Sequence, residues 1–168
     1  MQDSMYTLSA PIFTRMLGNL DAILDKAIAY AAQRKIDPSV LMASRLFPDM
    51  LPMSRQVQVA CDFAKGGISR LCGEEPPKWE DSEASLADLK ARIARTIAFV
   101  DSFAPARFEG ADTRIVELQI RGETVRLPGL DYLTKMVLPN FFFHVTTAYD
   151  LLRKDGVEIG KRDFIGPS

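Results

Sequence analysis

Four long segments of this chain repeat apolar residues at spacings of three and four, the pattern of a helix with one buried face. In the first segment, Phe13, Leu17, Leu20 and Leu24 mark that face. The four segments run over residues 9–34, 53–72, 85–103 and 131–153. Because each helix must bury its apolar stripe against others, the pattern predicts a mainly all-α fold. We expect an antiparallel four-helix bundle that forms a single domain over residues 1–168.

The connection between the first two helices is long. Residues 35–52 contain prolines, Pro48 among them, that a continuous helix would not tolerate. We expect one short helical turn there, with Asp37 as its N-terminal cap. The connection is also expected to lie against the bundle, because it carries the apolar residues Leu41, Leu46, Phe47 and Met50.

A second irregular region lies between the third and fourth helices. Residues 114–120 and 123–127 alternate apolar and polar side chains on either side of Arg121-Gly122. Alternation with β-branched residues around a glycine turn is typical of a β-hairpin. Two strands are too few to fold alone, so the sequence predicts a small hairpin attached to the bundle.

Three residues disturb the helical segments themselves. Gly66 and Gly67 lie in the middle of the second helix, where each glycine costs about 1 kcal/mol relative to alanine. A close approach to a neighbouring helix would explain that cost. Pro139 lies inside the last helix, which it should kink or leave with an unpaired carbonyl.

Composition narrows the classes of partner. The formal net charge is −1, which gives no electrostatic support to nucleic-acid binding. No stretch approaches the length of apolar sequence that spans a bilayer, and the N-terminal residues lack the pattern of a signal peptide. We therefore expect a cytoplasmic protein with reduced cysteines, no nucleic-acid partner and no membrane partner.

His144 is the single histidine of the chain. On a helical wheel of 100° per residue it falls on the core-facing side of the last helix, with Asn140 one turn earlier beside it. Burial of an imidazole and an amide costs free energy unless each finds a hydrogen-bond partner. Some hydrogen-bond partner must therefore satisfy each of them.

The second helix offers polar candidates on one flank of its apolar stripe: Gln58 and Asp62 one turn apart, with Arg55 and Lys65 adjacent. We expect Asp62 to accept a hydrogen bond from the His144 ring, which would fix the tautomer and favour the charged imidazolium. The alternative is a satisfied core histidine, with Asp62, Gln58 and Arg55 mostly in water.

The segment from His144 to Gly156, which ends Leu-Leu-Arg-Lys-Asp-Gly, resembles the end of the last helix in the DinB-like superfamily. There, too, a histidine precedes a run ending in Leu-Leu-Arg, with glycine three residues later. The resemblance implies an antiparallel four-helix bundle with a long link between the first two helices. Together with the segments 55–62 and 138–144, it places the chain near an uncharacterised bacterial branch.

Many members of that superfamily hold a divalent metal with three histidines, one on the second helix and a His-x-x-x-His pair on the last. In this register His144 matches the second histidine of the pair and Asn140 stands at the first. Asp62 or Gln58 would have to replace the histidine of the second helix. Because an amide oxygen is a weak ligand for zinc, the site is degenerate. We expect no cofactor, with a divalent metal as the alternative.

Three functional hypotheses remain. In the first, an enzyme or former enzyme takes a small-molecule ligand in a cleft between the second and last helices. His144 would act as general acid or base, oriented by Asp62, while Asn140, Arg55 and Gln58 bind polar groups of the ligand.

The second hypothesis is a non-catalytic binding or structural module that forms a homodimer. The Phe141-Phe142-Phe143 run wraps the last helix, so at least one ring points away from the core and could form the dimer contact. The third, implied by the resemblance alone, is a divalent-metal-dependent thiol transferase or hydrolase.

Overall fold

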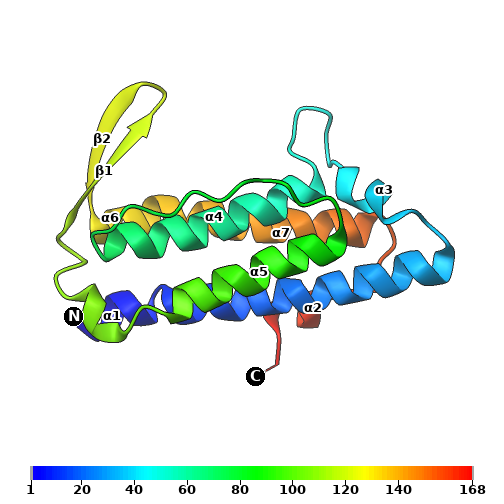
Figure 1. Ribbon diagram of the computed structural model, residues 1–168, viewed down its shortest axis with the longest axis horizontal. Coiled ribbons are helices and arrows are strands. Elements are labelled where there is room, and N and C mark those ends of the chain that lie inside the picture. The colour runs from blue at the N-terminus through cyan, green and yellow to red at the C-terminus, as the bar shows by residue number, and fades with distance from the viewer. Residues whose placement is uncertain (1, 168) are drawn as a thin grey trace.

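The computed structural model describes residues 2–167, and side chains from Met5 onward. Four long helical units form the bundle (Figure 1). The fourth unit is continuous but changes its helical geometry twice, and confirms the predicted last helix. The units are α2 (Ala10–Arg34), α4 (Met53–Leu71), α5 (Leu86–Asp101) and the succession α6 (Gly129–Tyr132), η2 (Leu133–Val137) and α7 (Leu138–Lys154).

A long connection, residues 73–84, joins α4 to α5 and is called the strap here. It runs back along the length of the bundle, so that α4 and α5 start at the same end and point in the same direction (Figure 1). Each long helix still packs against an antiparallel partner, α4 against α7 and α2 against α5. The predicted four-helix bundle is therefore confirmed, with a crossover that the sequence did not reveal.

The predicted connection between the first two long helices contains α3 (Pro38–Ala43). The Asp37 carboxylate accepts a hydrogen bond from the Ser39 backbone N–H at 2.9 Å, which confirms the cap. Leu41 is buried, but Leu46 is exposed and Phe47 is 63% exposed, so the connection lies against the bundle at α3 but, contrary to expectation, not at Leu46 and Phe47. Three further short helices were not predicted: α1 (Gln2–Thr7), η1 (Pro105–Phe108) and α8 (Lys161–Ile165).

The predicted hairpin is confirmed. Strand β1 (Ile115–Ile120) pairs antiparallel with β2 (Glu123–Pro128), and Ile120 lies opposite Glu123. Arg121 and Gly122 both have positive φ, 52° and 86°, which is the backbone of a type I′ turn. The hairpin rises from the end of the bundle where α6 begins (Figure 1).

The last helix adjusts to Pro139 by changing its hydrogen-bond spacing. Residues Leu133–Val137 form a π-helical turn, in which the Leu138 N–H bonds the Leu133 carbonyl five residues earlier. This wider turn directly precedes Pro139, which has no N–H to donate. Such turns are frequent at functional sites.

Within the described residues, none of the helices has the length and apolar character needed to cross a bilayer. The cytoplasmic location stays a prediction.

Candidate functional site

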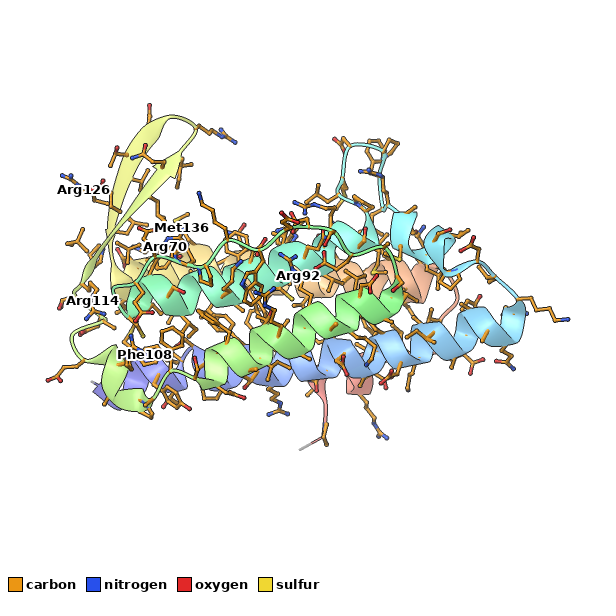
Figure 2. The ribbon with its side chains drawn as sticks, viewed as in Figure 1. Arg70, Arg92, Phe108, Arg114, Arg126 and Met136 are labelled. Carbon is orange, nitrogen blue, oxygen red and sulfur yellow. The ribbon has the colours of Figure 1, made fainter. Side chains whose placement is uncertain are left out.

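The structure contains a cleft of about 610 Å³ at the end of the bundle that carries the hairpin. Its floor is α4, one side is formed by α6 and η2, and the strap and β1 form the other walls. Arg70 and Met136, both at this cleft, lie below the hairpin in Figure 2. The lining residues are Asp62, Phe63, Lys65, Gly66, Gly67, Arg70, Glu75, Pro76, Pro77, Lys78, Trp79, Leu118, Gln119, Ile120, Tyr132 and Met136.

The two glycines of α4 shape the floor of the cleft in different ways. A Cβ atom at Gly67 would lie 2.7 Å from Val137 Cγ1, so the predicted close approach of two helices is confirmed. A Cβ atom at Gly66 would instead lie 2.8 Å from Arg70 Nη1. Gly66 therefore provides room for the Arg70 guanidinium to lie against its own helix.

Among the described residues, the partners of Arg70 are neutral groups. Its Nη1 donates to the Gly66 carbonyl at 3.4 Å and to the Tyr132 hydroxyl at 3.3 Å. The Tyr132 hydroxyl in turn donates to the Gly66 carbonyl at 3.5 Å. Burial raises the pKa of Tyr132, and the nearby Arg70 charge only partly opposes that rise. Tyr132 is therefore a neutral hydrogen-bond donor and acceptor at neutral pH.

Lys65 reaches the same cleft but is already neutralised. Its side chain is buried, with Nζ 2.9 Å from Asp62 Oδ1 and 4.5 Å from the centre of the Trp79 ring. The Arg95 guanidinium lies 4.0 Å from the centre of that same ring. These cation–π contacts fix Trp79 of the strap against α4 and α5.

Asp62 also belongs to an ion network behind the strap, centred on Arg92. Arg92, only 4% exposed, pairs with Asp62, Asp81 and Glu83 at distances of 2.9 to 3.0 Å. Arg55 pairs with Asp81, and its Nη1 lies 2.7 Å from the Gln58 side-chain oxygen. The network joins α4, α5 and the strap.

The Arg92 network holds Asp81 and Glu83 in the charged form. Burial alone would raise the pKa of Asp81, but hydrogen bonds and charges of Arg55 and Arg92 outweigh it and lower the pKa. The pKa of Glu83 is lowered in the same way, against burial, mainly by hydrogen bonds from Arg92 and Gln58. Cys61, next to this network, has a pKa raised by burial to about 12, so its thiol is not an activated nucleophile.

His144 is buried, as predicted, but its partner is Gln56. The His144 Nδ1 lies 2.6 Å from Gln56 Oε1, while Gln56 Nε2 donates to the Leu51 carbonyl at 3.0 Å. The amide oxygen therefore faces the ring and Nδ1 carries the proton. The other ring nitrogen, His144 Nε2, has no hydrogen-bond partner in the described part of the chain. Burial lowers the pKa of His144, so the ring is neutral at neutral pH, contrary to the expected imidazolium.

The expected hydrogen bond from His144 to Asp62 is not formed, since Asp62 faces Lys65 and Arg92 instead. On α4, Gln56 and Asp62 lie on opposite flanks of the apolar stripe, about 120° apart at 100° per residue. The Gln56 flank faces α7 and the Asp62 flank faces α5. Helical spacing separates the two flanks but does not identify the neighbour of each, and the expectation that Asp62 faces His144 is wrong.

The other predicted site residues lie apart from the cleft. Asn140 Nδ2 donates to the Met136 carbonyl at 2.7 Å, within its own helix. Arg55 and Gln58 belong to the Arg92 network, where Gln58 Nε2 donates to Glu83 at 2.6 Å. His144 stacks on Phe63, a residue of the cleft wall, but does not itself line the cleft. The catalytic or binding roles of these residues stay predictions.

The family model described as "Domain of unknown function (DUF1993)" matches residues 5–165, nearly all of the chain. The chain belongs to the DUF1993 family. It is also similar to a crystal structure at 1.83 Å resolution of a DinB family member protein from Shewanella denitrificans, with 43% sequence identity and a TM-score of 0.94. That match covers 99% of this chain and 94% of the other, and confirms the predicted DinB-like fold. No match was found among curated proteins.

The residues of this DUF1993 chain do not fit the three-histidine metal centre implied by its DinB-like fold. Gln56, rather than Asp62 or Gln58, faces His144, and the mutual hydrogen bond occupies the Nδ1–H and the amide oxygen. Asn140 adds only a neutral amide oxygen, a weak ligand for transition metals. Among the described residues, no group of three or more histidine, cysteine, aspartate or glutamate side chains could hold a metal ion.

Sequence reasoning missed Gln56, Arg70 and Tyr132 in this DUF1993 chain. Gln56 and Arg70 both lie on the α7-facing flank of α4, and the pair Gly66-Gly67 marks the same stretch of helix. Glycines at a helix position where a neighbour must approach were the available signal. Tyr132 carried no such signal, because its contacts with Arg70 and Gly66 join positions 62 and 66 residues apart in the sequence.

Proposed function

We propose that this DUF1993 chain binds a small molecule in the cleft between α4 and the α6–η2 segment. The observation that carries the proposal is the cleft itself. Its volume of about 610 Å³ lies within the range of about 300–1,000 Å³ typical of small-molecule sites. Apolar walls with a few convergent polar groups are also typical of such sites, and Arg70, Tyr132 and Lys65 are those groups here.

The cleft lies between the second and last long helices, as in the first functional hypothesis, but further toward the hairpin than His144. The stacked ring of Phe63 links the two places. A general acid or base role for His144 is therefore a separate hypothesis. Binding in the cleft does not require it, so a folded His144→Gln variant should keep the affinity of the cleft for its ligand.

The experiment is a thermal-shift screen of acidic, basic and neutral small molecules on the wild-type protein and on Met136→Trp. The larger indole should fill the cleft from η2, because Met136 lines it and is only half-buried. Met136→Leu keeps the volume and serves as the matched control. A ligand present at about 100 times its Kd stabilises the folded state by about 2.7 kcal/mol.

We expect compounds that stabilise the wild type and Met136→Leu to lose that effect in Met136→Trp. The proposal fails if no compound stabilises the wild type, or if the stabilising compounds act equally on the cleft-filled variant.

A second candidate is the non-catalytic homodimeric module. The observation in its favour is Phe143, which is 54% exposed on α7, as the wrapping of the Phe141-Phe142-Phe143 run requires. Analytical ultracentrifugation of wild type and Phe143→Ser tests it. A wild-type dimer that dissociates in the variant supports this candidate, and a monomeric wild type excludes it.

A further inference from the structure

We infer that the ligand of the cleft carries an acid group, a carboxylate or a phosphate, that binds the free edge of Arg70. The inference rests on the proposed function and names the class of its ligand.

Arg70 keeps part of its hydrogen-bonding capacity unused. The two contacts of its guanidinium, to Gly66 and Tyr132, both use Nη1. In the described part of the chain, Nε and Nη2 have no partner, and neither is sealed from solvent. These two N–H groups lie on one edge of the planar guanidinium. That edge is the fork that binds the two oxygens of a carboxylate or phosphate.

The charges of the cleft lining favour an anionic ligand. Three cations and two carboxylates line the cleft: Lys65, Arg70, Lys78, Asp62 and Glu75. Lys65 and Asp62 pair with each other, while Lys78 and Glu75 are exposed on the strap. Arg70 is therefore the half-buried charge of the cleft that has no carboxylate partner among the described residues, and it is positive. An anionic ligand would compensate it where water is partly excluded.

The apolar walls of the cleft favour an apolar body for the remainder of the ligand. Phe63, Met136, Leu118 and Ile120 are the apolar walls around the guanidinium. They would bury an apolar body attached to the acid group. A small organic acid, rather than a free inorganic ion, satisfies both the charge and the walls.

The experiment titrates the protein with phenylacetate, phenyl phosphate and the neutral phenylacetamide. Calorimetry gives the affinity, and the fluorescence of Trp79, the single tryptophan of the chain and a cleft residue, reports the location. We expect at least one acid to bind about tenfold more tightly than the amide, equivalent to about 1.4 kcal/mol. The two acids distinguish a carboxylate from a phosphate ligand.

Arg70→Gln should abolish the preference for the acid, and Arg70→Lys should restore only part of it, because lysine lacks the planar fork. Arg153→Gln, an exposed change near the end of α7, is the matched control and should leave affinity unchanged.

The inference is overturned if the amide binds as tightly as the acids, if Arg70→Gln leaves the affinity for the acid unchanged, or if neither acid saturates at millimolar concentration. The proposed function survives each of these results when neutral or basic compounds still bind the wild type and not Met136→Trp.

Discussion

Arg92 and Arg70 lie on opposite sides of α4 and differ in every contact. Arg92 is closed in by three carboxylates from α4 and the strap. Arg70 has two neutral partners on one nitrogen and a free edge toward the cleft. The first arrangement balances its charge without a ligand and joins parts of the fold, and its one unpartnered donor, Arg92 Nε, is sealed from solvent. The second leaves donors that solvent, and therefore a ligand, can reach. An arginine is therefore a binding candidate because of the donors it keeps accessible, not because of burial alone.

The largest expected effect on stability is at Arg92, the arginine surrounded by carboxylates. Arg92→Leu should lower the free energy of unfolding by about 3–5 kcal/mol, because it leaves the buried acid cluster without its central cation. Urea denaturation measures the change. Arg70→Gln is the control at the other arginine and should change stability by no more than about 0.5 kcal/mol. Equal losses in both variants would contradict the distinction between the two arginines.

A smaller effect is expected where α4 meets the last helix. Gly67→Ala should cost about 1–3 kcal/mol, because the new methyl group overlaps Val137 in a packed interface. Denaturation of the double variant Gly67→Ala with Val137→Ala should recover part of that loss, since the second change removes the overlapping atoms. A fully additive pair would show that the glycine serves some purpose other than close approach.

The pH dependence of folding stability distinguishes the contribution of His144 from that of the Arg92 network. The pKa of His144 is lowered in the folded state, so the unfolded chain binds the proton more readily. Stability is complete above the unfolded value of about 6.5 and falls as pH decreases below it, until the folded pKa is reached. Between the folded and unfolded pKa values, the free energy of unfolding falls by at most about 1.4 kcal/mol per pH unit.

Thermal unfolding at pH 7.5 and pH 5.5 measures this loss, and His144→Gln should show less of it. Asp81 and Glu83, whose folded pKa values are lowered from 3.8 and 4.5, lose their stabilising contribution only at more acidic pH. A wild type and a variant with the same dependence between pH 5.5 and 7.5 would exclude His144 as its source.

The parts of the fold that the sequence predicted are those decided by local chemistry. Apolar periodicity identified the four long helices, Asp37 marked a cap, and Arg121-Gly122 marked a hairpin turn. The wheel also placed His144 in the core. In each case the deciding contacts lie within a few residues or on one face of one element, which is the information that spacing carries.

The candidate site depended on information that spacing does not carry. The strap covers the outer surface of α4, so that Lys65, Gln58 and Ser69 are buried on a flank that polarity suggested was exposed. The direction of that crossover also decides which flank of α4 faces α5 and which faces α7. The partner of His144 and the position of Arg70 both follow from that choice.

Gly66 leaves the space in which the Arg70 guanidinium lies ready for a ligand, and the Gly66→Ala variant tests this most directly. Alanine favours a helix by about 1 kcal/mol over glycine, and its Cβ would lie 2.8 Å from Nη1, at the movable end of the side chain. We predict a protein at least as stable as wild type whose affinity for the bound acid falls about tenfold. Unchanged affinity in a stable Gly66→Ala protein would contradict the claim.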